Sequence, residues 1–522
     1  MKFIINNSLK MLIIIFIIIN IFIFFNNGLY WDDWCLITNK SISAITKGVG
    51  LSFMSPIHIF LMSLNTYQAL QYHLIILSLE IISIVLLYNI FKKISDNNKN
   101  IFIIILFYII IPYNESKILI STINYTAGFT VFLLSTYLYI SQLYKPNIIF
   151  RIISLLLLFL SFALLPSLLV FSLGITFLFS IYNFKERYID INKFLYNLYK
   201  SIDFLLIILL FWIFRLKFLM PTGVYAKVGY RTFTANNIIY LPNKILQSFY
   251  DNILAIHNII PQYFSILFVF ILFITIFFLN RFSVRYFRDN NNFHILILGI
   301  YLFFFATLAY SILGLTPEFG SVNSRHQILI KFAAPFILFY ILTLLSNVKY
   351  QNIFISFILI SSFSYSYSSQ LKFQKSWFKQ LALERLFKKE KNITNGDNFL
   401  IIDNTTIYNE FNGTYSTYNL NGILYKALGN QTHIAIDSKQ YNAQNNQIGI
   451  DSTDSMMKSI YHVNNVTNFT RLNYTYYINQ GPILLTYKQN IKMLYQYYFN
   501  KEKFNNSLDG IITLKRSNLI IY

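Results

Sequence analysis

Charged residues and cysteines are scarce in this 522-residue chain. Asp, Glu, Lys and Arg make up 12% of it, and there is a single cysteine, Cys35. One cysteine excludes an internal disulfide. The sequence also lacks a phosphate-binding glycine-rich loop, the Cys/His spacing of a metal site and a nucleophile elbow. These absences argue against ATP-driven transport and serine-hydrolase chemistry.

Apolar residues are abundant instead: 55% of the chain is hydrophobic and 19% is aromatic. Runs such as 11–25, 102–111 and 155–165 approach the ~20 apolar residues needed to cross a bilayer. The sequence therefore predicts an α-helical polytopic membrane protein with about eleven spans. These lie near 9–25, 67–91, 100–113, 124–143, 149–165, 167–183, 201–219, 263–280, 294–313, 328–346 and 351–369. Only Pro166 separates the fifth from the sixth, which predicts a tight hairpin.

The first run follows Lys2 and Lys10 and resembles a signal peptide, but no small-residue cleavage site comes after it. We interpret it as a retained anchor. The next residues are Trp31-Asp32-Asp33-Trp34, called the acidic motif below.

The net charge of +21 could suggest nucleic acid, but its distribution indicates a membrane topology. Basic residues concentrate in alternate loops and are sparser in the others, and the positive-inside rule places the richer loops in the cytoplasm. The richer set is Lys2, Lys10, Lys92, Lys93, Lys99, Lys145, Arg151, Lys185, Arg187, Lys193, Lys200, Arg281, Arg285, Arg288 and Lys349. This predicts a bacterial or archaeal integral membrane protein with a cytoplasmic N-terminus, an external acidic motif and no nucleic-acid partner.

The composition changes after residue 370. Short β-like runs at 398–403 and 433–437 alternate with helical stretches, which is typical of a small α/β domain. We therefore expect a transmembrane domain over 1–369 and an extracytoplasmic domain over 370–522.

The acidic motif holds the first candidate site residues, Asp32 and Asp33. A carboxylate at the outer interface can act as a general base or bind a divalent cation such as Mg²⁺ or Mn²⁺, with Asp32 as the candidate ligand. Adjacent like charges separate the pKa values of the two groups, which suits divided roles. The alternative is a solvated cap on the first span.

The second candidate is Arg325, in Ser324-Arg325-His326-Gln327 at the outer entrance of the tenth predicted span. An arginine there can bind a phosphate through two hydrogen bonds, assisted by the helix N-terminus. The alternative is an interfacial arginine extended toward water. His326 is a weaker substrate-binding candidate.

Further substrate-binding candidates are Glu115, His58 and Arg231. Glu115 lies in a short external hairpin, which could bring it beside Asp33 or leave it paired with Lys117. His58 follows Pro56 in 51–64, an apolar segment that suits an interfacial helix; it could line an acceptor site, ligate a metal or be an ordinary interfacial residue.

Arg231 lies in the large external loop 220–262, where an amphipathic helix is expected around 243–257. It could meet lipid phosphates. Glu80 lies inside the second predicted span. An ionisable residue there either has a functional role or forms a structural hydrogen bond within the bundle.

These features together resemble the C-type (GT-C) membrane glycosyltransferases, in which many spans surround a first external loop with an acidic motif followed by interfacial helices. The acidic motif, segment 51–64, the tight hairpin, Arg325 and the C-terminal domain carry the resemblance. It implies a polyprenyl-phosphate-linked sugar donor, a glycan, lipid or protein acceptor, and inverting transfer in contact with membrane lipids. Asp33 would be the base and Asp32 its partner or a metal ligand, or the reverse. Arg325 or a metal ion would stabilise the leaving phosphate.

The oligosaccharide transferase signature Trp-Trp-Asp-Tyr-Gly is absent, which disfavours en bloc N-glycosylation. Two other functions stay open. A polysaccharide polymerase or O-antigen ligase would use Arg231 and His257 in loop 220–262. A transporter or lipid flippase would use mid-membrane charges, for which Glu80 and Asp203 are the candidates, and would show repeat symmetry, which the sequence lacks.

Overall fold

The computed structural model describes residues 8–64, 69–95, 97–183, 188–189, 194–227, 239–259, 293–345 and 347–390. It also describes 393–518 except for 394–396, 430–431, 438–440, 443–446, 449–454, 465, 467–471 and 473. Arg231 and the predicted span 263–280 lie outside these residues, and of Lys227 and His257 only the backbone is described.

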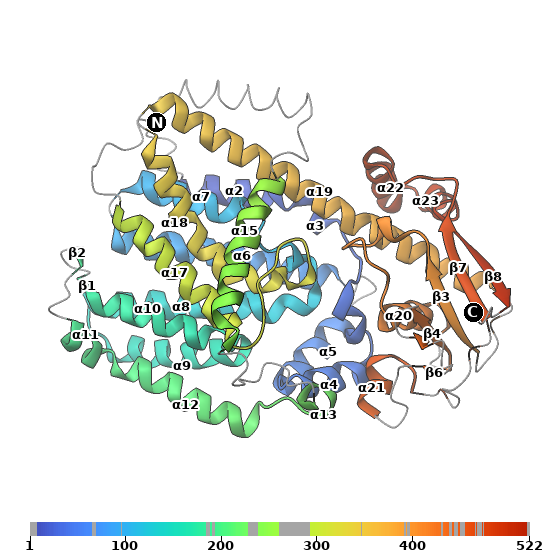
Figure 1. The fold of residues 1–522 in the computed structure, drawn as a ribbon, viewed down its shortest axis with the longest axis horizontal. Helices are drawn as coiled ribbons and strands as arrows, with labels where there is room; N and C mark the ends of the chain where they lie inside the picture. The colour runs from blue at the N-terminus through green and yellow to red at the C-terminus, as the bar shows by residue number, and fades with distance from the viewer. Residues whose placement is uncertain are drawn as a thin grey trace.

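Helices form the body of the protein, on the left of Figure 1. They are α2 (Ser8–Ile19), α3 (Ile21–Phe24), α6 (Leu70–Ile94), α7 (Asn98–Ile110), α8 (Ile123–Tyr144), α9 (Ile148–Leu164), α10 (Leu168–Ile181), α11 (Phe194–Lys200), α12 (Ile202–Phe218), α15 (Leu241–Ile259), α17 (Phe293–Ser311) and α18 (Ile328–Leu344). A small hairpin of β1 (Tyr182–Asn183) and β2 (Tyr188–Ile189) joins α10 to α11.

Among the described residues, three helical stretches are long and apolar enough to cross a membrane: Leu70–Ile94, Phe293–Ser311 and Val322–Leu344. Shorter apolar helices include α2, α7, α9 and α10. A helical membrane protein is therefore supported, while the number of eleven spans and their orientation stay predictions. The predicted hairpin is confirmed as α9 and α10 joined at 165–167.

Asparagine side chains cap three of these helices at their starts. Asn97 accepts the backbone N–H groups of Lys99 and Asn100 at the start of α7, and Asn147 does the same for the N-terminus of α9. Asn347 caps the next long helix, α19 (Val348–Lys389), by accepting the N–H of Lys349. Such caps satisfy backbone donors that have no partner inside the helix.

At the end of the body that faces the C-terminal region, short helices connect the long ones. They are η1 (Trp31–Leu36), α4 (Asn39–Gly48), η2 (Ser52–Met54), α5 (Ser55–Ser63), η3 (Glu115–Ile118), η4 (Ile120–Thr122), α13 (Gly223–Lys227) and η7 (Val322–Gln327). The predicted helical segment 51–64 corresponds to η2 and α5, and Pro56 lies in the first turn of α5, where it needs no N–H partner. The helix expected around 243–257 is α15.

Helix α19 runs from the body into the C-terminal region without a break (Figure 1). Its 42 residues correspond to about 63 Å at a rise of 1.5 Å per residue. The expected boundary at 369/370 therefore falls inside one continuous helix. The composition changes there, but the backbone continues, and beyond 370 the buried side chains of Phe373 and Trp377 contact Phe411 and Tyr497 of the C-terminal region.

The C-terminal region contains a four-stranded mixed sheet in the order β4-β3-β7-β8. The strands are β3 (Asn398–Asp403), β4 (Ile434–Asp437), β7 (Tyr474–Gln480) and β8 (Ile512–Asn518). β3 pairs in parallel with β4 and β7, and β8 is antiparallel to β7. The helices are η8 (Thr406–Tyr408), α20 (Thr417–Leu428), α21 (Ser455–Ile460), α22 (Tyr487–Phe499) and α23 (Lys501–Leu508), with a hairpin of β5 (Tyr441–Asn442) and β6 (Gln447–Ile448). The strands predicted at 398–403 and 433–437 are confirmed as β3 and β4 of a small mixed sheet.

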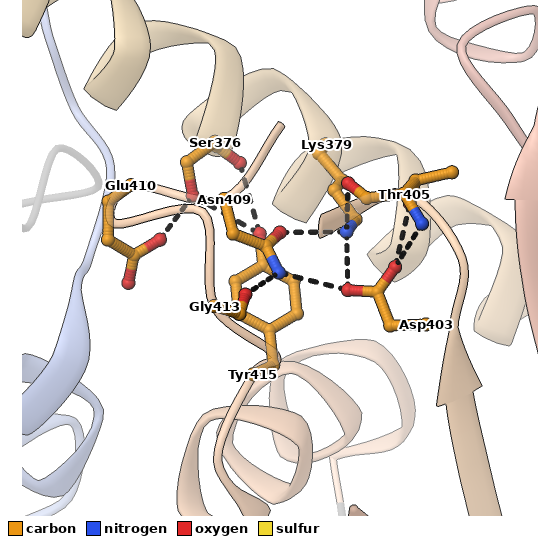
Figure 2. A network of polar contacts seen from close by, with 8 residues as sticks. All are labelled: Ser376, Lys379, Asp403, Thr405, Asn409, Glu410, Gly413 and Tyr415. Atoms are coloured by element: carbon orange, nitrogen blue, oxygen red, sulfur yellow. Dashed lines mark hydrogen bonds and ion pairs between the residues drawn. The ribbon is translucent and has the colours of Figure 1, made fainter. Parts of the chain in front are cut away.

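A buried polar network joins α19 to the end of β3 (Figure 2). The Lys379 ammonium, which is fully buried, donates to Asp403 at 2.6 Å, to the Asn409 side chain at 2.7 Å and to the Thr405 carbonyl at 3.1 Å. Burial lowers the pKa of Lys379, and the adjacent Asp403 carboxylate opposes that shift. Because each group in the network has partners, it fixes the sheet to α19.

Candidate functional site

The acidic motif forms η1, and Asp33 holds this short helix in place. Its Oδ2 accepts the N–H of Tyr30 at 3.0 Å, and its Oδ1 accepts the N–H of Ser121, in η4, at 2.9 Å. The side chain is fully buried, and this burial raises the pKa of Asp33 to about 7 against the opposing effect of the backbone donors. Asp33 therefore links the first loop to the turn before α8, and neither oxygen faces a substrate.

Asp32 lies differently, with 31% of its side chain exposed. Its Oδ2 is 3.0 Å from Nη1 of Arg325, and the Tyr418 hydroxyl of α20 lies 3.5 Å from its Oδ1. Three distant parts of the chain therefore meet at one carboxylate. Of the two assignments left open by the sequence, this geometry favours Asp32 as the reactive group and Asp33 as its support.

Trp31, directly before Asp32, has a backbone conformation that non-glycine residues rarely adopt. Its φ is +47°, a region that costs on the order of 1–3 kcal/mol for such residues. The Glu410 carboxylate accepts a hydrogen bond from the Trp31 backbone and another, at 2.6 Å, from the Ser376 hydroxyl of α19. Burial raises the pKa of Glu410. The Glu410 side chain, from the C-terminal region, thus helps to hold Trp31 in this conformation. The conformation of Trp31 in turn orients the adjacent Asp32.

Trp34, at the other end of the motif, anchors the C-terminal domain. Its ring packs on Gly422 of α20 so closely that a Cβ there would lie 2.5 Å from the ring. The Lys426 ammonium sits 5.2 Å from the centre of the Trp34 ring, and Nε2 of His462 donates to the Trp34 carbonyl at 2.6 Å. Interfacial tryptophans are ordinary from sequence alone, but this one is a contact between domains.

Arg325 is positioned by η7, immediately before α18, as the sequence predicted. Ser321 caps η7 by accepting the N–H of Asn323, and the Ser324 hydroxyl accepts the N–H of Ser116 in η3 at 3.0 Å. His326 is 2% exposed and packs between aromatic rings. Its Nε2 lies 3.5 Å from the Tyr125 hydroxyl, and its ring centre lies 5.2 Å from that of Tyr310. His326 therefore lies next to Arg325 in the chain, but its side chain is buried among aromatic rings.

Glu115 lines a cavity of about 60 Å³ between the body and the C-terminal domain. Burial raises the pKa of Glu115 to about 7, and its Oε1 accepts no hydrogen bond within the described residues. The lining residues are Glu115, Gly320, Tyr365, Ser369, Lys372, Glu410, Phe411 and Asn412. The cavity adjoins the acidic motif, because Glu410 also holds Trp31.

His58 is buried inside the body. Its Nδ1 lies 2.9 Å from the Tyr72 hydroxyl, which also donates to the His58 carbonyl at 3.2 Å. Only 2% of His58 is exposed, and burial lowers its pKa to about 4. These contacts favour the ordinary structural role over acceptor or metal binding.

The charges expected inside the helical body are paired. Glu80 meets Lys331 of α18 at 2.8 Å, both nearly fully buried, and Asp203 meets Arg151 at 2.5 Å. The Lys331 ammonium also lies 4.5 Å from the Tyr108 ring centre. Ion pairs between helices supply the hydrogen-bond partners that buried charges require, which matches the structural alternative for Glu80.

The donor set at Asp32 is a poor fit for a divalent cation. Within the part of the chain that the structure describes, no three His, Cys, Asp or Glu side chains gather as a metal-binding group. The Arg325 guanidinium already faces one Asp32 oxygen, and both oxygens of Asp33 accept backbone N–H groups. A cation at Asp32 could reach only Oδ1 without displacing Arg325, and the positive charge of the nearby guanidinium would oppose its binding.

Comparisons with known proteins complete the description of the site. No protein-family model matches the chain, and no curated protein or solved structure is significantly similar to it. Function must therefore be argued from the site itself.

Sequence reasoning missed Glu410 and Tyr418. Both lie in the C-terminal domain, far along the chain from the acidic motif, and no local pattern marks either of them. The closest signal was the expectation that the C-terminal domain lies on the same side of the membrane as the motif.

Proposed function

We propose that the protein is a membrane glycosyltransferase that moves a sugar from a polyprenyl-phosphate donor to a glycan, lipid or protein acceptor at the outer face of the membrane. The observation that carries this proposal is the pairing of Asp32 with Arg325 on a strained loop between the helical body and the C-terminal domain. A carboxylate that can act as a base and a guanidinium that can bind phosphate lie 3.0 Å apart. Inverting sugar transfer from a lipid phosphate can use a base for the acceptor hydroxyl and a cation for the leaving phosphate.

In the proposed reaction, the Asp32 carboxylate takes the proton of the acceptor hydroxyl as that oxygen attacks the anomeric carbon. The bond between this carbon and the phosphate oxygen breaks, and the phosphate leaves with the bonding electrons. Arg325 stabilises the charge that develops on it, because its planar guanidinium can donate two parallel hydrogen bonds to phosphate. Attack opposite the leaving group inverts the anomeric configuration.

Arg325 also regulates the base in this scheme. Before the donor binds, Arg325 holds Asp32 in an ion pair that is partly exposed to solvent. The donor phosphate is a diester with the same single negative charge as the carboxylate, but its two free oxygens can accept two parallel hydrogen bonds from Arg325. Once Arg325 turns to the phosphate, Asp32 is released to accept a proton. The base thus becomes available only when the donor is present.

The surrounding residues position these two groups. Asp33 fixes η1 against η4, and Glu410 fixes Trp31 next to Asp32. The cavity beside Glu410 and Glu115 has polar side chains that suit sugar hydroxyls, so we place the acceptor there. The poor fit of a cation at Asp32 means that no step is assigned to a metal.

The decisive experiment replaces Asp32 by Asn and compares the glycans and lipids of the host with and without the gene. The full chain carrying Asp32→Asn is expected to insert and fold but to lose transfer by a factor of about 10²–10⁴, the usual contribution of a general base. The matched control is Asp509→Asn, which changes an exposed carboxylate on the C-terminal domain that pairs with Arg385. If Asp32→Asn transfers sugar as well as the control does, the proposal is wrong. Movement of a lipid across the membrane without a new glycosidic bond would indicate a flippase instead.

A further inference from the structure

Helix α22 of the C-terminal domain presents a face of large apolar side chains to the outside. Tyr495 is 64% exposed, Phe499 74% and Ile491 49%. We call the exposed set of Leu484, Tyr487, Ile491, Tyr495, Tyr498 and Phe499 the aromatic stripe. From Tyr487 onward its members recur every three to four residues, which places them on one side of the helix.

The opposite side of α22 packs into the domain, where Asn490, Met493, Leu494 and Gln496 are buried. Exposed lysines, Lys488 and Lys492, accompany the aromatic stripe on the outer surface. Aromatic and aliphatic side chains beside lysines are typical of helices that lie in the interface of a bilayer. The rings enter the boundary between headgroups and acyl chains, while lysines extend to lipid phosphates.

Two contacts fix the level of α22 relative to the apolar helices. The Tyr498 hydroxyl donates to the carbonyl of Phe25, which directly follows α3, at 3.3 Å. At the other end, the Tyr487 hydroxyl lies 2.9 Å from the Ser368 hydroxyl of α19.

Ser368 lies beside the first apolar segment, which is formed by α2 and α3. Its neighbours on α19, Tyr367 and Gln370, donate to the carbonyls of Ile18 and Ile19 in α2. Both ends of α22 therefore lie beside the last turns of the first apolar segment, where a spanning helix would reach the membrane surface. Figure 1 shows α22 next to α19, on the side of the C-terminal domain nearer to α3.

We propose that α22 docks the C-terminal domain onto the lipid bilayer itself, with the aromatic stripe in the interface and Lys488 and Lys492 on anionic headgroups. The occupant of this face is lipid, because the contacts with Phe25 and Ser368 continue the level of the helical body and the lysines complement phosphate. The inference depends on membrane insertion of the body and is independent of the transfer reaction. A docked α22 would hold the domain, and Glu410 with it, at a constant height above the bilayer.

The test uses the full chain with Cys35 replaced by Ser, so that an introduced cysteine is the only one. Tyr495→Cys and Phe499→Cys variants are labelled with a polarity-sensitive fluorophore and reconstituted in vesicles of phosphatidylcholine and phosphatidylglycerol. Thr513→Cys is the control, because Thr513 is exposed on β8, at the far side of the domain from the helical body (Figure 1). Lipids that carry a nitroxide near the headgroup serve as the quencher.

We expect blue-shifted emission and strong quenching at positions 495 and 499, and neither effect at 513. Replacing Lys488 and Lys492 together by Glu is expected to reduce the quenching. The proposal is overturned if the labels at 495 and 499 are quenched no more than the label at 513. It is also overturned if these labels are blue-shifted in the vesicles but not quenched by the nitroxide lipids, because a second protein copy would then cover the face.

Discussion

The Asp32 carboxylate and the Arg325 guanidinium form an ion pair at 3.0 Å although 293 residues separate them in sequence. The pair connects the first loop of the chain with the entrance of α18, so the two segments cannot move apart without separating opposite charges. It is partly open to solvent, with 31% of the Asp32 side chain and 16% of the Arg325 side chain exposed. The pair therefore adds little to the stability of the protein, because partly exposed ion pairs contribute little to folding.

Arg325→Lys tests the phosphate-binding role. Lysine keeps the charge but loses the planar pair of donors, so the KM for the lipid-phosphate donor is expected to rise by about tenfold or more. Arg325→Ala should lower kcat as well, because the leaving group then lacks a cation. Steady-state kinetics in nanodiscs, with Arg385→Lys as the control at an exposed pair, measure both effects. Unchanged donor KM in Arg325→Lys would contradict the role.

Glu410→Gln tests whether the C-terminal domain positions the acidic motif. The amide replaces one carboxylate oxygen by an NH₂ group, which cannot accept a hydrogen bond, so the contacts with Trp31 and Ser376 should weaken and the Trp31 conformation should relax. We expect kcat to fall by about one order of magnitude or more with little change in donor KM. Glu384→Gln is the matched control, because Glu384 pairs with Lys388 on the surface of α19. Equal kinetics for the two variants would show that Glu410 is only structural.

Gly422→Ala tests the contact between Trp34 and α20. A Cβ at this position would lie 2.5 Å from the Trp34 ring, and overpacking of this kind costs about 1–3 kcal/mol. The expected result is faster proteolytic cleavage between the helical body and the C-terminal domain, together with a lower melting temperature. Gly413→Ala should leave both unchanged, since a Cβ there meets nothing within 4 Å. If both variants behave alike, Trp34 does not anchor the domain.

Glu115 gives the stability of the protein a defined dependence on pH. Burial raises its pKa from 4.5 to about 7, so between these values the folded state retains a proton that the unfolded chain has lost. Stability is therefore highest below pH 4.5 for this group and falls as the pH rises to about 7. Melting temperatures of the wild type should drop more steeply over this window than those of Glu115→Gln. Parallel curves would contradict the shift. Asp33 acts in the same direction, and because both variants keep it, the difference isolates Glu115.

Chelation of divalent cations is expected to leave transfer unchanged, because Arg325 already supplies a positive charge beside Asp32. Activity assays with and without a chelator, followed by addition of Mg²⁺ or Mn²⁺, provide the measurement. A loss that either ion restores would assign Asp32 to a metal site after all.

Much of the helical body could be predicted from sequence because apolar runs and their caps are local signals. The spans expected at 67–91 and 294–313 match α6 and α17 to within a few residues. The continuity of α19 could not be predicted. Charged residues after 370 obscure this continuity, because the C-terminal region buries side chains such as Phe373 and Trp377 of the same helix.

The site was predicted less completely than the fold. The sequence placed Asp32, Asp33 and Arg325 in one region, but the division of roles depends on which aspartate meets the N–H of Ser121, and that contact is not local. From the sequence, His58 could have bound a substrate or a metal. Its hydrogen-bond partner Tyr72 lies in a different helix, so no local pattern revealed the contact. Glu410 had no local signal, since its importance comes from the φ of Trp31.

Helix α19 sets a register between two halves of the protein. One residue added near its middle would turn everything beyond it by about 100° and advance it by about 1.5 Å. Glu410 and Tyr418 would then turn away from Trp31 and Asp32. Such an insertion leaves every site residue in the sequence, yet it would separate the site residues of the helical body from those of the C-terminal region. The length of this helix is thus as much a part of the site as any carboxylate in it.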